Sequence, residues 1–194
     1  MRAEELSDRL LLAVDGWEGR DYLGMSQIGG CPRWLYEKLT NGQQQPGRRA
    51  LLAMHEGRMH RRDILERLKV AGVAVTGQGR ELTAGFDERV RGHVQGEIDG
   101  DLLLIKTVRD WDALSQVMER GPRPRDRDQI QMYMRYGGWQ RGLIIYKDRQ
   151  GGDVWVCWAS VDEERGARLE RKARMILAAV DAGEAPECEC GRCY

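Results

Sequence analysis

Residues 90–108 restrict the fold more than any other part of this sequence. Two strand-like runs, 90–98 and 102–108, flank the dipeptide Asp99-Gly100, a strong signal for a hairpin with a two-residue turn. In such a hairpin, residues whose numbers sum to 199 face each other, so Gln95 lies opposite Leu104. Because side chains alternate along a strand, one face carries six residues: His93, Gln95, Glu97, Leu102, Leu104 and Lys106.

Helical and strand-like patterns surround this hairpin on both sides. We expect helices over residues 4–15, 32–39, 48–71, 111–119, 126–137 and 162–182. We expect further strands over residues 73–75, 79–82, 142–146 and 154–159. We expect a three-stranded antiparallel meander in this region, in which the hairpin joins the last two strands, 90–98 and 102–108. The expected order is helix, strands, helix, strands, helix.

Length and charge place limits on the class of protein. A chain of 194 residues fits one domain, 1–194. Lys+Arg and Asp+Glu balance at 31 each, so any nucleic-acid site must be a local patch. No stretch approaches the roughly 18 apolar residues of a membrane span, and the polar, acidic N-terminus does not resemble a signal peptide. We therefore expect a cytoplasmic protein without a membrane partner.

The cysteines indicate a bound metal or cluster rather than disulfides. Three of the five, Cys188, Cys190 and Cys193, lie in the last seven residues, where almost no apolar side chain could build a core. Cys31, just before a helix start, is the natural fourth ligand, whereas Cys157 lies in an apolar strand and is expected in the core. Four thiolates suit either a [4Fe–4S] cluster or a structural zinc, and the irregular spacing slightly favours the cluster.

The cysteine layout resembles that of Cas4 and the related RecB-like nucleases. Ser26, Cys31 and Arg33, followed by three cysteines near the C-terminus, match their pattern. The resemblance implies a [4Fe–4S] cluster and an α/β (α+β) fold of the PD-(D/E)XK restriction-endonuclease-like kind, with a central mixed sheet flanked by helices. It places the nuclease-like core at about residues 48–160, and the cluster region at residues 26–40 and 183–194.

The hairpin resembles the catalytic motif of the same nucleases. GHVQGEIDGDLLLIKT, residues 92–107, is similar to "GHIDG…LLEIKT", in which two carboxylates hold Mg²⁺ or Mn²⁺ and a lysine assists cleavage. The resemblance implies that Lys106 is that lysine and that His60, in Gly57-x-x-His60, binds the metal. Gln95 and Leu104 stand where the family has its carboxylates. Neither side chain supplies the anionic oxygen that a divalent cation needs.

Two explanations of these replacements stay open. Glu97, on the same face of the hairpin, is the near carboxylate that could take over metal binding. Alternatively, Leu104 beside the Lys106 stem indicates a site that has been converted to packing.

A second set of residues points to DNA. Gln129-x3-Tyr133 resembles the Q-x3-Y motif with which RecB-like nucleases help to bind DNA, and Arg123, Arg125 and Arg127 lie just before it. These arginines could contact phosphates. Taken without the resemblance, the same residues suit an ordinary amphipathic helix with Tyr133 in the core, and a solvated charged surface in which Asp126 and Asp128 are interleaved.

Three functional hypotheses follow. The first is a protein that binds DNA, or a partner in a nuclease, recombination or CRISPR-type assembly, without cleaving DNA. The second is an active metal-dependent DNA exonuclease that uses Glu97 and His60. The third is a zinc-stabilised structural protein.

Overall fold

The structure is a computed structural model that describes residue 5 and residues 19–42 and 46–191. The helix expected over residues 4–15 lies, except for Glu5, outside the described residues. Among the described residues, no helix is both long enough and apolar enough to span a lipid bilayer.

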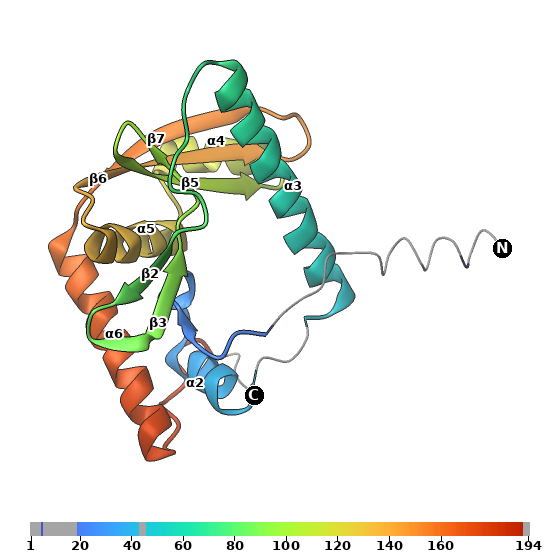
Figure 1. Cartoon of the computed structure of the whole chain (residues 1–194). Coiled ribbons are helices and arrows are strands. Elements are labelled where there is room, and N and C mark those ends of the chain that lie inside the picture. The colour runs from blue at the N-terminus through green and yellow to red at the C-terminus, as the bar shows by residue number, and fades with distance from the viewer. Residues whose placement is uncertain (1–4, 6–18, 43–45, 192–194) are drawn as a thin grey trace.

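A mixed four-stranded sheet forms the centre of the fold (Figure 1). Its strands are β4 (Glu97–Ile98), β5 (Asp101–Val108), β6 (Arg141–Asp148) and β7 (Val154–Ser160), in the order β4-β5-β6-β7. β5 and β6 are parallel, and the two outer pairs are antiparallel. The parallel pair needs a crossover, which helices α4 (Trp111–Arg120) and α5 (Pro124–Gly137) supply.

Helices cover both faces of β5, which explains its nearly continuous apolar run. On one face α3 (Arg48–Val70) packs Ile64 against Leu103 and Ile105. On the other face Leu102 and Leu104 belong to the main core, together with Ile130 of α5. Odd-numbered and even-numbered side chains of β5 therefore lie in two separate apolar layers.

A second, smaller sheet holds the segment that precedes the hairpin. It consists of β1 (Leu23–Gly24), β2 (Glu81–Ala84) and β3 (Asp87–His93), in the order β1-β3-β2. The 3₁₀ helix η1 (Met25–Gln27) follows β1 and contacts α5 and β3.

The expected three-stranded meander is wrong, because its strands are divided between the two sheets. The run 90–98 is broken: β3 ends at His93 and β4 begins at Glu97. Gly96 lies in the break with its backbone against the Val75 side chain, where a Cβ atom would collide. Residues 73–75 form no strand, and Thr76 makes a single bridge to Glu97. The close packing at Gly96 thus ends one sheet before the next begins.

The N-terminal and C-terminal parts of the described chain meet at α2 (Pro32–Thr40) and α6 (Glu163–Ala182), which pack against each other. Pro32 at the first position starts α2. The Asp162 carboxylate accepts a hydrogen bond from the Arg165 N–H and caps α6, which ends at Gly183 with a φ of 71°. These local signals explain why the helix bounds agree closely with the sequence-based expectation.

Glu170 of α6 joins α6 to α5. Its Oε2 accepts hydrogen bonds from Arg135 Nε at 2.9 Å and from the Tyr136 hydroxyl at 2.8 Å, and Arg174 NH2 donates to Oε1 at 2.7 Å. Burial opposes ionisation of Glu170, but the hydrogen bonds from Arg174, Arg135 and Tyr136 outweigh it and lower its pKa to about 2. The ionised carboxylate is therefore the form that the folded state prefers.

We expect Glu170→Gln to lower the free energy of unfolding at pH 7 by about 1–2 kcal/mol, because charge-assisted hydrogen bonds are lost. Because the pKa of Glu170 is lower in the folded state than in the unfolded state, its ionised form stabilises the fold. This stabilisation is present above the unfolded pKa of 4.5 and is lost as the pH falls toward about 2. Urea unfolding at pH 7 and pH 3 should show a smaller difference between wild type and variant at pH 3. Glu164→Gln, on the exposed side of α6, is the control; an equal loss in both variants would contradict the role of Glu170.

Candidate functional site

The Asp99-Gly100 turn positions the candidate site as the sequence indicates. Both residues have positive φ, 51° and 84°, as a type I′ hairpin turn requires. Glu97 pairs with Leu102 and Ile98 with Asp101, so the predicted sum of 199 is confirmed. The Leu103 N–H continues this register by donating to the Gly96 carbonyl at 2.8 Å.

The Gln95 side chain extends the pairing with β5 at a point before β4 begins. The Ile105 N–H donates to Gln95 Oε1 at 2.5 Å. The amide oxygen therefore acts as a hydrogen-bond acceptor for β5, next to Leu104. A neutral amide in this role contributes no anionic oxygen for a metal ion.

Leu104 lies in the core. It is 0% exposed, pairs in register with Ile144 and belongs to the same apolar cluster as Ile130. A packed hydrocarbon side chain thus occupies the position where the resemblance predicts a second carboxylate.

Lys106, on the same face, is enclosed by α5. Its ammonium donates to Gln129 Oε1 at 2.5 Å and lies 3.2 Å from Asp126 Oδ1. Burial lowers the pKa of Lys106, and the nearby Asp126 carboxylate opposes that shift. The lysine packs against α5 and is largely buried, with 21% of its side chain exposed.

Asp126 is the neighbour of Lys106 that sequence reasoning missed. It is 4% exposed, and its Oδ2 accepts hydrogen bonds at 2.7 Å from both the Tyr146 hydroxyl and Arg123 Nε. Burial opposes its ionisation, but Lys106 and Arg123 outweigh that effect and lower its pKa. The spacing of Asp126 and Gln129, three residues apart on one helix face, is the signal that could have identified it.

Gln129 and Tyr133 both point into the fold, with exposures of 5% and 4%. The Tyr133 hydroxyl is hydrogen-bonded to Gln129 and to the backbone of His93, and burial raises its pKa. Its ring also contacts β3 so closely that a Cβ atom at Gly92 would lie 2.7 Å from it. Tyr133 therefore packs α5 against the smaller sheet. Contact of Gln129 and Tyr133 with DNA stays a prediction.

Glu97 is already held by two neighbours. Its Oε1 lies 3.0 Å from Arg80 NH2, and its Oε2 accepts a hydrogen bond from Trp139 Nε1 at 3.2 Å. These contacts anchor the carboxylate at the beginning of β5, two positions away from Gln95.

His60 lies on α3, in a separate charged group. Burial lowers its pKa, and the nearby Lys147 and Arg149 lower it further, against the opposing effect of Glu56 and Asp63. Lys147 pairs in register with Thr107, so it belongs to the face of the sheet opposite Lys106. In the part of the chain that the structure describes, His60 and Glu97 do not belong to any group of three or more close metal ligands.

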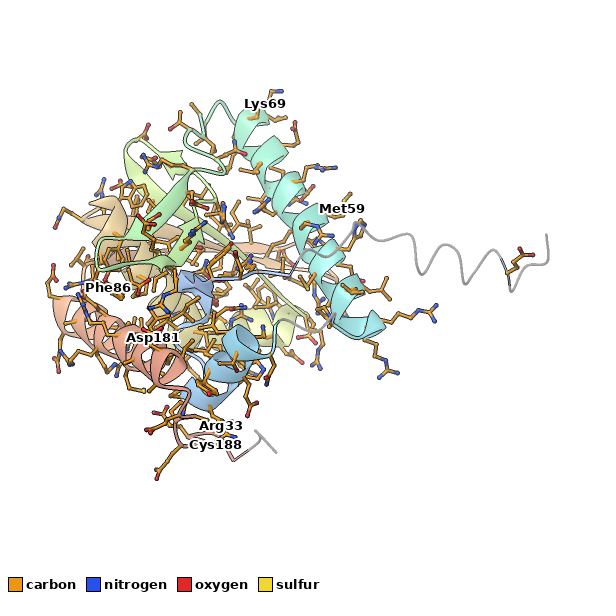
Figure 2. All side chains as sticks on the ribbon, turned by 60° about the horizontal axis from the view of Figure 1, so that its bottom comes forward. Arg33, Met59, Lys69, Phe86, Asp181 and Cys188 are labelled. Atoms are coloured by element: carbon orange, nitrogen blue, oxygen red, sulfur yellow. The ribbon has the colours of Figure 1, made fainter. Side chains whose placement is uncertain are left out.

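The cysteines do form such a group. Sγ of Cys31, which precedes α2, lies 4.0 Å from Sγ of Cys188, and Cys188 lies 3.6 Å from Cys190. All three sulfur atoms are within 4.8 Å of one another. Figure 2 shows Cys188 beside Arg33 in the first turn of α2. Three convergent thiolates fit a metal or cluster, and Cys193 lies outside the described residues.

Cys157 differs from these three cysteines. It is half-buried in β7, packs against the main core, and its thiol donates to the Ile144 carbonyl at 3.8 Å. Burial raises its pKa to about 11, so it is a protonated packing residue at neutral pH.

The arginines before Gln129 have different surroundings. Arg123 is paired with Asp126 and lies 5.4 Å from the centroid of the Tyr146 ring. Arg125 and Arg127 are exposed on the first turn of α5.

The mixed sheet, its flanking helices and the parallel β5–β6 pair define a protein with the PD-(D/E)XK nuclease fold. No protein-family model and no curated protein matches the sequence. Among solved structures, an alkaline exonuclease (LHK-Exo) from Laribacter hongkongensis matches with a TM-score of 0.67 and 17% identity, over 84% of this chain and 89% of that one. The same enzyme in complex with dAMP gives a TM-score of 0.65 at 18% identity, with the same coverage.

Another match spans more of this chain. The structure of SSO0001 covers 98% of this chain and 89% of its own length, with a TM-score of 0.56 and 17% identity. At these identities the likeness establishes the fold. This chain therefore shares its fold with these solved structures.

Proposed function

We propose that this protein binds DNA without hydrolysing it, and that it acts by holding DNA or by joining a nuclease, recombination or CRISPR-type assembly. One observation carries the proposal: Leu104 is 0% exposed in the core while Gln95 Oε1 accepts the Ile105 N–H. At the two positions where the resemblance predicts carboxylates, Leu104 packs in the core and Gln95 accepts a backbone hydrogen bond.

The chemistry of cleavage explains why this observation matters. Mg²⁺ and Mn²⁺ are hard cations that need carboxylate oxygens, and in nucleases they activate water and stabilise charge on the phosphate. Lys106 cannot replace the metal, because its ammonium is enclosed by Gln129 and Asp126. The residues that remain of the motif therefore stabilise the fold and do not form a hydrolytic centre.

DNA as the ligand is supported by the exonuclease fold and by the arginines around the first turn of α5. Guanidinium groups contact phosphates regardless of sequence. Arg123, Arg125 and Arg127 are the residues that we assign to such contacts.

We also propose that Cys31, Cys188, Cys190 and Cys193 hold a [4Fe–4S] cluster that ties the C-terminal segment to α2. The resemblance to Cas4 supports the cluster. Zinc is a second candidate, favoured by sulfur separations of 3.6 and 4.0 Å. Four bonds of about 2.3 Å to one tetrahedral ion place sulfur atoms about 3.8 Å apart.

The proposed function predicts DNA binding without cleavage. End-labelled single-stranded and double-stranded DNA, incubated with metal-loaded protein and Mn²⁺ or Mg²⁺, should stay intact and should shift in a native gel. Reactions with chelator and an active nuclease control the assay.

Cleavage that is lost both with chelator and in Lys106→Met would contradict the proposal. The methionine keeps the length of the buried stem while removing the charge, which makes it preferable to alanine. If Glu97→Ala also abolished that cleavage, the exonuclease hypothesis with Glu97 and His60 would replace ours.

A further inference from the structure

A strongly basic cavity lies at the end of β5, away from the cysteines. It has a volume of about 760 Å³ and is bounded by α3, the end of β5, α4 and the loop between α4 and α5. Five of its lining residues are arginines and none is acidic: Arg109, Arg120, Arg123, Arg127 and Arg149.

Carboxylates outside the cavity neutralise three of these arginines. Arg109 pairs with Asp110 at 2.5 Å, Arg123 with Asp126 at 2.7 Å, and Arg149 with Glu56 at 3.1 Å. Within the described residues, Arg120 and Arg127 have no ion pair. Five guanidinium groups and three carboxylate partners leave an excess of two positive charges.

This excess is notable because basic and acidic residues balance over the whole chain, at 31 each. Two guanidinium groups without carboxylate partners line this one cavity, and such uncompensated positive charge favours a bound anion. The cavity therefore carries a local positive excess in a chain whose total charges balance.

Backbone and hydroxyl groups add to this positive potential. α5 begins at Pro124, which lines the cavity together with Arg127 in the same first turn. The dipole of the helix favours an anion at this end, whereas the N–H groups of Asp126 and Arg127 already donate to the Arg123 carbonyl. Thr107, the residue after Lys106, also lines the cavity and carries a hydroxyl that donates to phosphate oxygens.

We propose that this cavity binds a phosphate group of a nucleic-acid strand, with Arg120 and Arg127 as its main contacts. Arginine presents a planar fork of donors that matches two phosphate oxygens. The inference rests on the proposed function and deepens it, because it places one phosphate of the bound strand at the end of β5, beside the first turn of α5.

Binding of a fluorescent oligonucleotide to the full chain tests this inference. We expect Arg120→Ala and Arg127→Ala each to weaken binding about 10-fold at low salt, and to reduce the slope of log affinity against log salt by about 0.7–0.9. Arg171→Ala is the control, because Arg171 is exposed on α6 and does not line the cavity; we expect it to change affinity less than threefold. Equal melting temperatures should show that all three variants are folded.

Strand ends distinguish the two sources of phosphate. If removal of a 5′- or 3′-phosphate weakens binding to the wild type but not to the double variant Arg120→Ala/Arg127→Ala, the cavity holds a terminal phosphate. If end chemistry has no effect while the arginine variants still bind weakly, it holds an internal phosphodiester. Either result supports the inference.

Other results separate this inference from the proposed function. If Arg120→Ala and Arg127→Ala bind DNA as tightly as wild type, the cavity is not the phosphate site, while the protein remains a DNA-binding protein. If the wild type binds no DNA, the proposed function fails and the cavity loses its nucleic-acid ligand. Pyrophosphate that raised the melting temperature of the wild type but not of the double variant would then identify a site for small anions.

Discussion

Gln95→Asp combined with Leu104→Glu is expected to introduce Mn²⁺-dependent DNA cleavage. The two substitutions place one carboxylate at position 95, whose side chain contacts the Ile105 N–H, and one at position 104, on the face of β5 that also carries Lys106. A bound metal stabilises the charge of the transition state by several kcal/mol, which corresponds to a rate about 10²–10³-fold above that of wild type. Release of labelled nucleotides with Mn²⁺, compared with Ca²⁺ and chelator, measures this gain.

Single variants provide the controls. Leu104→Glu alone should lose about 3–5 kcal/mol of unfolding free energy, because it removes a fully buried leucine and buries a carboxyl group without a partner. In the double variant, Mn²⁺ should raise the melting temperature by binding only to the folded state. Neither single variant should cleave DNA, and Lys106→Met in the double variant should abolish the new activity.

The possible failures have different meanings. A double variant that melts at a higher temperature with Mn²⁺ but does not cleave DNA would show that metal binding alone is insufficient. The enclosure of Lys106 by Gln129 and Asp126 would then be the second obstacle to catalysis. Absence of any Mn²⁺ effect would contradict the assignment of positions 95 and 104.

Features of the fold that depend on local chemistry could be predicted from the sequence. Asp99-Gly100 determines the turn because both residues take positive φ, and the register of the hairpin follows from it. Pro32 and Gly183 mark the limits of their helices for similarly local reasons. The convergence of the Cys31, Cys188 and Cys190 sulfur atoms was also predictable, because a terminal segment with so few apolar residues suggests ligation.

Features that depend on distant packing could not be predicted. The break at Gly96 arises from contact with Val75, and nothing in the alternating pattern of residues 90–98 indicates it. The ion pair of Lys106 with Asp126 requires α5 to lie across β5, so Asp126 looked like one charge in a mixed surface run. The basic cavity likewise combines arginines from separated segments, including Arg109 and Arg149.

Loss of a single ligating cysteine is expected to remove the metal or cluster. Cys31→Ser and Cys188→Ser each replace a thiolate in the group whose sulfurs lie within 4.8 Å of one another, and Cys193→Ser should act in the same way as the proposed fourth ligand. A ligand present at about a thousand times its Kd stabilises the folded state by about 4 kcal/mol, so its loss should lower the melting temperature by about 10 °C. Metal analysis and thermal unfolding of anaerobically purified protein measure both effects.

Cys157→Ser is the matched control, because its thiol lies in β7 and donates to a backbone carbonyl; it should retain the full metal content.

Iron with an equal amount of acid-labile sulfide, and visible absorbance, would support the [4Fe–4S] cluster. Zinc without sulfide would support the structural alternative. In a [4Fe–4S] cluster each cysteine binds a different iron atom, so the cysteine sulfurs lie further apart than they do around a single ion. Binding of a cluster would therefore require the Sγ–Sγ separations of 3.6 and 4.0 Å to increase. Full metal content in Cys31→Ser would show that the C-terminal cysteines bind independently of α2.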